Sequence, residues 1–236
     1  MNLILLFKND FTGDDNAVRL SGRRYRHITE IHRASVGDEL CVGLANGNVG
    51  SGKVTVIGMD FLEMDVRLDR RPPEKLPLTL VLAMPRPIAL GRILAAVAAM
   101  GVGKVALIGS GRVEKSYWQS PVLNEEKIKE HLILGLEQAR DTVMPEVIIR
   151  KLFKPFVEDE LPDIIKGTMP IAAHPEAETA CPRSEGSPVT LAVGPEGGFL
   201  PYETEKLRQT GFSLVTIGNR ILKVETAIPY IISRLF

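Results

Sequence analysis

The sequence contains few of the residues from which disulfide scaffolds and metal centres are built. Its only two cysteines, Cys41 and Cys181, lie far apart without CxxC spacing, and its four histidines form no HxxxH or HExxH pattern. We therefore expect free thiols and no metal site. The longest apolar runs, residues 93–102 and 227–232, are much shorter than the roughly 20 residues that span a bilayer, so we expect no membrane partner.

An excess of charge of one sign is also absent, because 29 basic residues balance 29 acidic residues. The first residues include a short apolar stretch, 3–7, but no basic leader before it and no cleavage site after it. We therefore expect no signal peptide and a cytoplasmic location. A hydrophobic content of 44% and a charged content of 25% are typical of a soluble globular protein with one or two domains.

The positive charge is concentrated in one short stretch, residues 19–33. This stretch contains a single acid, Glu30, beside two histidines and five arginines: Arg19, Arg23, Arg24, Arg26 and Arg33. A local arginine patch in a chain of balanced charge suits docking on RNA through one face, so these five arginines are the candidate RNA-binding residues. A solvated surface with internal salt bridges is the alternative interpretation.

The composition changes near residue 70. Residues 1–70 contain short β-rich segments separated by glycine-containing turns, which predict a small β-barrel or sandwich. Residues 71–77 are charged and proline-rich and predict a linker. From residue 78 to 236 strand-like and helix-like patterns alternate, which predicts an α/β domain with a mostly parallel sheet covered by helices.

The elements expected in this second domain follow from apolar runs and helix signals. We expect strands at 78–84, 104–108, 147–149, 169–173, 189–193 and 212–217, and helices at 88–100, 124–141, 201–211 and 226–235. The third of these helices has clear start and stop signals: Pro201 fits its first position, Glu203 and Glu205 fit its first turn, and Gly211 fits its C-terminal stop.

Two of the three glycine-rich segments suit ligand binding. Residues 101–105 fail as a P-loop, because Val105 follows Gly-Lys and the segment enters a strand. Residues 194–199, Gly-Pro-Glu-Gly-Gly-Phe, follow a buried strand, and paired glycines let backbone approach a ligand; a tight turn is the alternative. Residues 216–227 repeat the order of strand, glycine, loop and helix. Two such loops at adjacent strand ends predict a pocket for a polar ligand with an apolar portion.

These two motifs, in this order and about 20 residues apart, resemble those of the SPOUT methyltransferases. They are most similar to the 16S ribosomal RNA uracil-N3 methyltransferase family, which methylates the uridine conventionally numbered 1498. Glu137-Gln138 with Pro145, and Gly109-Ser110-Gly111-Arg112, also resemble segments of that family. Near the N-terminus, His27-Ile28, Arg33 and Gly37-Asp38 are similar to its PUA-like RNA-binding domain.

The resemblance implies a PUA-like β-barrel followed by a SPOUT domain with a deep trefoil knot. It further implies a homodimer that acts on 16S rRNA of the small ribosomal subunit, with S-adenosyl-L-methionine as cofactor and no DNA partner. The residues that the resemblance assigns to cofactor binding are Gly194, Pro195, Glu196, Gly197, Gly198, Ile217, Gly218, Ile221, Leu222 and Thr226.

Methylation of uracil N3 requires loss of a proton that is retained at neutral pH, and stabilisation of the resulting negative charge. The candidate cations are Arg220, Lys223, Arg140 and Arg112, the last from the same or a partner subunit. Glu225 or Glu196 is the candidate proton acceptor, although either could instead cap a helix or bind a loop amide. Tyr117 and Trp118 suit stacking on an unpaired base or, equally, contacts in the core or a dimer interface.

Three departures from the family pattern leave alternatives open. The family usually has arginine at the position of Lys223. It usually has lysine and glutamate where this chain has Ala96 and Ala99. The arginine of the family's Glu-Gln segment stands one position earlier in this chain, as Arg140. The alternatives are a SPOUT methyltransferase for another RNA site, such as a ribose 2′-oxygen, and a non-catalytic RNA-binding or assembly factor.

Overall fold

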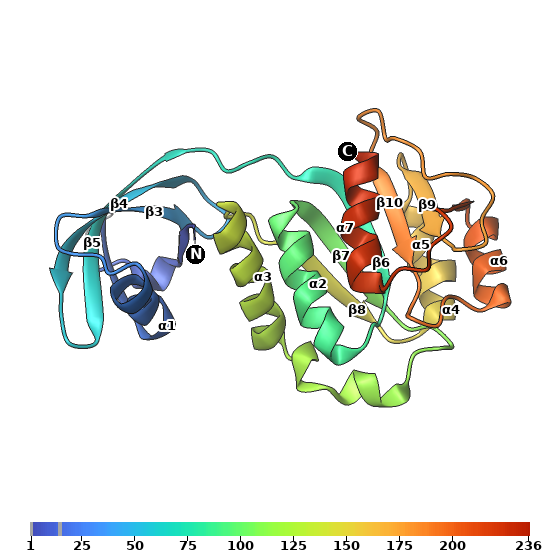
Figure 1. Ribbon diagram of the computed structural model, residues 1–236, viewed down its shortest axis with the longest axis horizontal. Coiled ribbons are helices and arrows are strands. Elements are labelled where there is room, and N and C mark those ends of the chain that lie inside the picture. Colours follow the sequence, from blue (N-terminus) through green and yellow to red (C-terminus); the bar gives the residue numbers. More distant parts are fainter. Residues whose placement is uncertain (1, 14–15) are drawn as a thin grey trace. The chain divides into compact units, whose positions relative to one another are not determined.

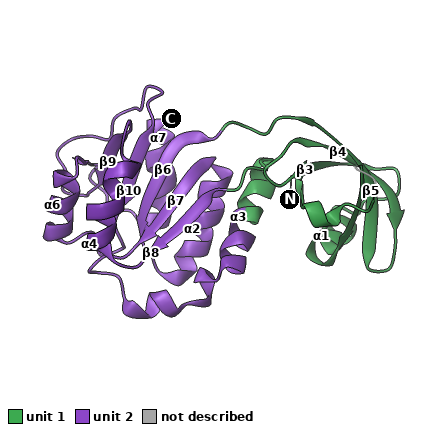
Figure 2. Ribbon diagram, turned by 180° about the vertical axis from the view of Figure 1, so that it is seen from behind, with its two compact units in different colours: residues 1–74, 133–144 green, residues 75–132, 145–236 purple. Residues whose placement is uncertain are grey.

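The computed structural model describes residues 2–13 and 16–236, which divide into two compact units (Figure 2). Unit 1 comprises Met1–Glu74 and Ile133–Met144, and unit 2 comprises Lys75–Leu132 and Pro145–Phe236. A short stretch from the middle of the chain therefore belongs with the N-terminal unit. Helix α3 (Glu125–Ala139) contributes residues to both units.

Unit 1 is built on one curled five-stranded sheet with the order β1-β3-β4-β5-β2 (Figure 1). Its strands are β1 (Ile4–Leu6), β2 (Ala17–Ser21), β3 (Glu39–Leu44), β4 (Val49–Ile57) and β5 (Phe61–Arg70). The pairing of β1 with β3 is parallel and the other pairings are antiparallel. Leu62, Met64 and Val66 of β5 are buried with the period of two that a half-exposed strand requires, and they belong to the core of this unit.

The arginine-rich stretch of unit 1 continues from β2 into helical structure. It forms helix α1 (Gly22–Arg26) and a π-helical turn, η2 (His27–Ile31), and a 3₁₀ turn, η1 (Lys8–Asp10), lies earlier in the chain. The sequence analysis predicted no helix here, because five residues of α1 carry no recognisable apolar period.

Unit 2 contains the predicted parallel sheet. All five strand pairings in the order β11-β9-β10-β6-β7-β8 are parallel. The strands are β6 (Leu76–Ala83), β7 (Val102–Ile108), β8 (Glu146–Arg150), β9 (Met169–Ala173), β10 (Val189–Val193) and β11 (Ser213–Val215). Each lies within two residues of a strand predicted from an apolar run.

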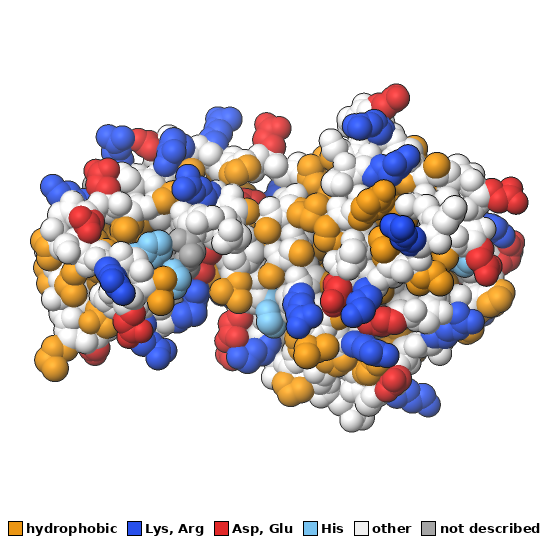
Figure 3. Space-filling view, in the orientation of Figure 1, with side chains coloured by type: hydrophobic (Ala, Val, Ile, Leu, Met, Phe, Trp, Pro, Cys, Tyr) orange, Lys and Arg blue, Asp and Glu red, His pale blue; other side chains and the backbone are white. Residues whose placement is uncertain are grey.

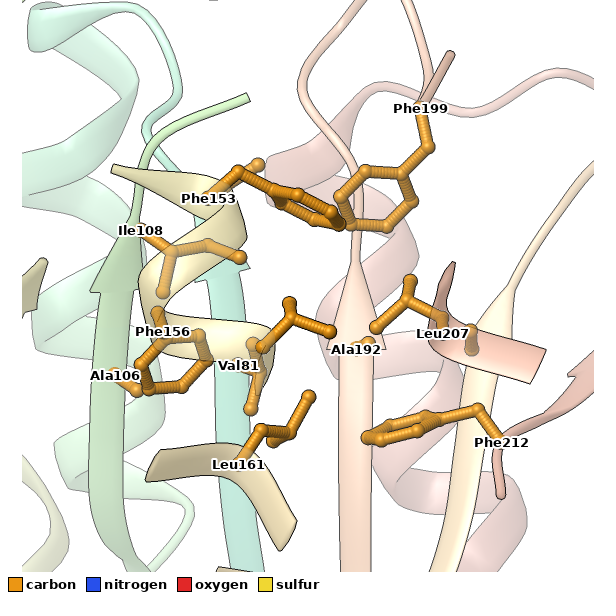
Figure 4. Packing of buried hydrophobic residues seen from close by; sticks show 13 residues of the cluster. Val81, Ala106, Ile108, Phe153, Phe156, Leu161, Ala192, Phe199, Leu207 and Phe212 are labelled. Atoms are coloured by element: carbon orange, nitrogen blue, oxygen red, sulfur yellow. The ribbon is translucent and has the colours of Figure 1, made fainter. Parts of the chain in front are cut away.

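Helices cover both faces of this sheet, with α2 (Pro87–Ala99) and α7 (Val224–Leu235) packed together on one of them (Figure 1). The other face carries α4 (Phe153–Pro155), η5 (Phe156–Glu160), α5 (Leu161–Ile164) and α6 (Pro201–Gln209). Figure 4 shows the core on that face, where Phe153 and Phe156 lie over Val81 and Ala106 of the sheet. Two 3₁₀ turns, η3 (Lys115–Gln119) and η4 (Pro121–Leu123), precede α3.

The connection from β9 to β10 is hydrogen-bonded to the last part of the chain. The Cys181 amide donates to the carbonyl of Thr216 at 2.9 Å, and the Thr216 amide donates to the carbonyl of Thr179 at 2.7 Å. Farther along, the Ser184 amide donates to the carbonyl of Leu235 at 2.9 Å, and Arg234 Nε donates to the carbonyl of Cys181 at 3.0 Å. This connection is thus fastened to both β11 and the end of α7.

Candidate cofactor and substrate site

A pocket opens at the carboxyl ends of β9, β10 and β11, the edge at which open α/β sheets bind ligands. Its lining comes from residues 173–175, from residues 193–199, and from residues 215–227. The two predicted glycine loops therefore meet in one cavity.

The expectation that these two loops leave adjacent strands is wrong. Strands β10 and β11 both pair with β9, which lies between them. After α6 the chain returns on the far side of β9, so β9 adds Ala173, His174 and Pro175 to the pocket. The sequence analysis missed these three residues, because no glycine motif marks the end of β9.

Eight of the ten residues predicted to bind the cofactor line this pocket, and two do not. The lining includes Gly194, Pro195, Glu196, Gly198, Ile217, Gly218, Ile221 and Leu222. Gly197 and Thr226 are outside it, and Thr226 is exposed in the first turn of α7. Arg220, predicted as a catalytic cation, lines the pocket with its side chain exposed.

Two lining residues, Gly218 and Glu196, show how the loops keep their shape. Gly218 has a φ of +121°, and a Cβ there would meet no atom within 4 Å, so backbone conformation and not crowding requires glycine. Glu196 Oε1 accepts a 3.0 Å hydrogen bond from the amide of Arg86, the residue before α2. The sequence analysis gave helix capping and a loop-amide contact as alternatives to proton transfer for Glu196, and the structure contains the loop-amide contact.

The side of Gly197 on which a Cβ would lie is occupied by Arg112, and Gly197 does not line the pocket. The Arg112 guanidinium donates to the Gly197 carbonyl, and a Cβ on Gly197 would lie 3.1 Å from Arg112 Cδ. The second glycine of this pair, Gly198, has a φ of +75° and does line the pocket. The paired glycines therefore serve two different neighbours, a side chain of the same unit and the pocket.

The other predicted catalytic residues do not line the pocket. Lys223 is exposed at the N-terminal end of α7, where its carbonyl accepts the amide hydrogens of Thr226 and Ala227. Glu225 Oε1 lies 3.6 Å from Arg92 Nη1 of α2, which forms an ion pair. Arg140 belongs to unit 1 and ends α3 with a φ of +57°.

Tyr117 and Trp118 lie half-buried on η3, outside the pocket lining. The Tyr117 hydroxyl donates to Glu114 Oε1 at 3.1 Å. Burial of this hydroxyl and its bond to the Glu114 carboxylate raise the pKa of Tyr117, while the nearby Arg86 guanidinium partly opposes the shift. The tyrosine is therefore a neutral hydrogen-bond donor at physiological pH.

Three of the five candidate RNA-binding arginines already contact acidic side chains within unit 1. Arg24 binds Asp10 through two hydrogen bonds, Arg23 Nη2 lies 2.9 Å from Glu137 Oε2, and Arg19 stacks on Phe61 with Glu63 at 3.8 Å. Arg26 and Arg33 are exposed and form no ion pair within residues 2–13 and 16–236. On the face shown in Figure 3, basic side chains of unit 1 alternate with acidic ones.

Glu137 fastens the inserted stretch to the N-terminal strand. Its side chain is 1% exposed and accepts hydrogen bonds from Arg23 and the Leu5 amide, while its carbonyl accepts the amides of Asn2 and Leu3. Burial raises the pKa of the Glu137 carboxyl, and the positive charge of Arg23 partly offsets the rise. The Glu-Gln segment singled out in the sequence is therefore a structural contact of unit 1.

No helix in the part of the chain that the structure describes is long and apolar enough to cross a membrane. Among the same residues, no cluster of three or more His, Cys, Asp or Glu side chains is arranged to hold a metal ion.

Comparison with known proteins gives a consistent family. The model of a family described as the RNA methyltransferase domain matches residues 72–236. The chain is 28% identical over 232 residues to the ribosomal RNA small subunit methyltransferase E of Treponema pallidum, covering 96% of this chain and 87% of that protein. It is 25% identical over 228 residues to methyltransferase E 1 of Borreliella burgdorferi, covering 96% and 94%.

The fold is similar to that of a solved structure, the ribosomal RNA small subunit methyltransferase E of Neisseria gonorrhoeae bound to S-adenosyl methionine. The TM-score is 0.76 at 20% sequence identity, and the superposition covers 99% of this chain and 95% of the other.

Proposed function

The chain belongs to the RNA methyltransferase domain family, and from that membership we propose that it methylates N3 of uridine 1498 in 16S rRNA of the small ribosomal subunit, with S-adenosyl-L-methionine as methyl donor. The observation that carries the proposal is the meeting of the two glycine loops in one pocket beside Arg220. The names of the two bacterial relatives support the small-subunit target.

The residues of the pocket fit S-adenosyl-L-methionine. Gly194, Gly198 and Gly218 have no side chain of their own, so a ligand can approach the backbone closely there, which suits the polar parts of the cofactor. Ile217 and Leu222 offer apolar surface for its adenine ring. When bound, the cofactor supplies an electrophilic methyl group. The other expected contacts come from Pro195, Glu196, Ile221 and, at the edges of the site, Gly197 and Thr226.

Arg220 is the residue best placed to stabilise negative charge on the uracil ring. It lines the pocket, and its guanidinium forms no ion pair within the described part of the chain. A free cation at this place favours the deprotonated form of uracil, which is the form that attacks a methyl group through N3. Lys223, exposed three residues later, is a second cation for the same substrate or for its phosphates.

Glu225 is the better candidate for the proton acceptor. Its chain neighbour Val224 lines the pocket and its ion pair with Arg92 is long, at 3.6 Å, whereas one oxygen of Glu196 already accepts a 3.0 Å hydrogen bond from the Arg86 amide. Arg112 and Arg140 stay the further candidate cations of this proposal, although neither lines the pocket.

The wider architecture is part of the proposal. The hydrogen bonds that fasten the β9–β10 connection to Thr216 and to the end of α7 support a deep trefoil knot. Hydrophobic side chains exposed on α2 and α7, Ile88 and Tyr230, support a homodimer through these two helices. The curled sheet of unit 1, with Arg26 and Arg33 free to bind phosphate, supports a PUA-like barrel that docks on rRNA. Such an enzyme acts in the cytoplasm.

The test is incubation of the purified protein with unmodified 30S subunits and S-adenosyl-L-methionine, followed by nucleoside mass spectrometry and primer extension. We expect 3-methyluridine at position 1498. A methylated nucleoside elsewhere would keep the chemistry and assign another target, as the residues at Ala96, Ala99 and Lys223 allow. Absence of both methylation and calorimetric cofactor binding would favour the non-catalytic RNA-binding alternative.

Arg220→Ala is the matching variant. We expect kcat to fall by about 100-fold or more, because loss of a charge-stabilising donor in an active site costs about 10²–10³ in kcat. Arg208→Ala is the control, since Arg208 is exposed on α6 and its nearest acid, Glu205, lies 3.8 Å away. Equal turnover by both variants would remove Arg220 from the mechanism.

A further inference from the structure

A buried carboxylate lies behind the two loops of the site. Glu203, in the first turn of α6, is 1% exposed although it carries an ionisable group. Its two oxygens accept three hydrogen bonds: from Ser110 Oγ at 2.9 Å, from the Gly111 amide at 2.8 Å, and from the Leu200 amide at 2.8 Å. The last bond caps α6, and the first two fix residues that belong to a different loop.

The loop that Glu203 fixes follows β7 and has little freedom. The Gly109 amide donates to the Arg150 carbonyl at 2.8 Å, and a Cβ on Gly109 would lie 2.1 Å from the carbonyl oxygen of Lys151. A Cβ on Gly111 would lie 2.4 Å from Leu200 Cδ1. Backbone therefore packs directly on its neighbours on both sides of Ser110, and the residue that emerges next is Arg112.

Arg112 carries this constraint to the pocket. Its guanidinium donates to the carbonyl of Gly197, whose chain neighbours Glu196 and Gly198 both line the pocket. Glu203 thus holds Ser110 and Gly111, and Arg112 beside them holds the cofactor loop. A continuous series of contacts connects α6 with the lining of the pocket.

We propose that Glu203 is a positioning residue for methyl transfer, which acts by holding Arg112 against the Gly194–Gly198 loop. The proposal rests on the proposed function, because the step that it supports is the methylation carried out in this pocket. A carboxylate is required because two oxygens must accept three donors. Glutamine has the same shape but only one oxygen. Its NH₂ group would therefore face either the Gly111 amide or the Ser110 hydroxyl and the Leu200 amide, which are donors and not acceptors in the wild type.

Steady-state kinetics of Glu203→Gln test the role in catalysis. We expect kcat to fall by about 10- to 100-fold with a smaller change in KM for RNA, since small displacements of positioning groups cost rates of this size. Ser110→Ala, which leaves the cap of α6 intact, should show a weaker loss in the same direction. Glu205→Gln, exposed on the same helix, is the control with unchanged kinetics.

A double variant separates positioning from a general loss of structure. If Glu203 acts through Arg112, adding Glu203→Gln to Arg112→Ala should change kcat by no more than about twofold beyond Arg112→Ala alone. Losses that multiply in the double variant would contradict the proposal, as would wild-type kcat in Glu203→Gln.

Limited digestion with trypsin tests the contact without any methyl transfer. We expect cleavage at Arg112–Val113 to be about 5- to 30-fold faster in Glu203→Gln than in the wild type, since loss of hydrogen bonds worth one to two kcal/mol opens the loop by that factor. Cleavage at the exposed Lys166–Gly167 bond is the internal reference. Unchanged cleavage at Arg112 would overturn the proposal. Faster cleavage in Glu203→Gln, combined with a wild-type protein that methylates nothing, would reject only the proposed function and leave the contact in place.

Discussion

Gly218 shows what a single residue contributes to this site through its backbone. It lies between β11 and α7 with a φ of +121°, and the space around its α-carbon is open. Its neighbours Ile217 and Ile221 line the pocket, so the direction in which the chain leaves Gly218 decides where these side chains lie. This backbone conformation is unfavourable for any residue with a Cβ, even where the Cβ meets no other atom.

We therefore predict that Gly218→Ala weakens cofactor binding by about tenfold, which corresponds to the roughly 1–2 kcal/mol cost of placing alanine in left-handed backbone. Isothermal titration calorimetry measures the affinity. Gly103→Ala in β7 is the matched control, because a Cβ there also meets no atom within 4 Å and its φ is ordinary. Equal affinity in both variants would show that the loop adapts without cost.

At the same scale, sequence patterns located the pocket better than they explained it. The glycine pair at 197 and 198 was interpreted as an approach for ligand, and that holds for Gly198 alone, because the open side of Gly197 receives Arg112. Glu203 was noted as a first-turn acid, with no partner predicted for its carboxylate. Its partners Ser110 and Gly111 lie more than 90 residues away in the chain, and no local pattern reports such a contact.

At the scale of elements, the short stretch after α3, residues 140–144, holds the turn between β3 and β4 in place. Thr142 is fully buried, its hydroxyl donates to the Gly47 carbonyl at 2.5 Å, and its carbonyl accepts the amide of Asn46 at 2.8 Å. Asn46 Oδ1 in turn accepts the amide of Met144 at 2.8 Å. The turn between β3 and β4 is therefore clasped by a segment that lies almost a hundred residues later.

We predict that Thr142→Val destabilises the protein by about 1 kcal/mol, because valine keeps the shape of the side chain and removes the hydrogen bond to the half-buried Gly47 carbonyl. Urea unfolding monitored by circular dichroism measures the change. Thr12→Val is the control, since Thr12 is exposed and its hydroxyl bond to Ala17 is long, at 3.5 Å. A loss of the same size in both variants would contradict a specific role for Thr142.

Apolar periodicity predicted the strands of unit 2, but it did not predict the helical structure of the arginine-rich stretch in unit 1. Buried parallel strands such as β9 and β10 stand out as continuous apolar runs, and both have the predicted bounds. The arginine-rich stretch gave no such signal. Its helical form became visible only with its partners, Asp10 and Glu137, which satisfy Arg24 and Arg23 from outside the stretch.

At the scale of the whole molecule, unit 1 is assembled from two separate parts of the chain, residues 1–74 and 133–144. The second part supplies Leu136 and Glu137, both essentially buried, and accepts hydrogen bonds from the first strand region. A composition change near residue 70 marks where the first part ends. Nothing in the composition of residues 133–144 marks them as belonging with it, because they continue the amphipathic pattern of α3.

We predict that a fragment comprising residues 1–77 does not fold, because it lacks Glu137 and Thr142, whose hydrogen bonds hold the first strand region and the turn between β3 and β4. Its ¹H–¹⁵N correlation spectrum should show poor dispersion, and its far-ultraviolet circular dichroism should be that of an unfolded chain. The full-length protein is the control. A well-dispersed spectrum of the fragment would show that residues 133–144 are dispensable for folding.

This composite construction of unit 1 also bears on how genes of this kind can recombine. The chain passes from one unit to the other after residues 74, 132 and 144, so no single crossover in the gene transfers unit 1 without also transferring part of unit 2. An exchange confined to the first stretch would combine a new sheet with the old Glu137 and Thr142, which bind residues of the former one. Natural variants of this protein should therefore inherit the two stretches together.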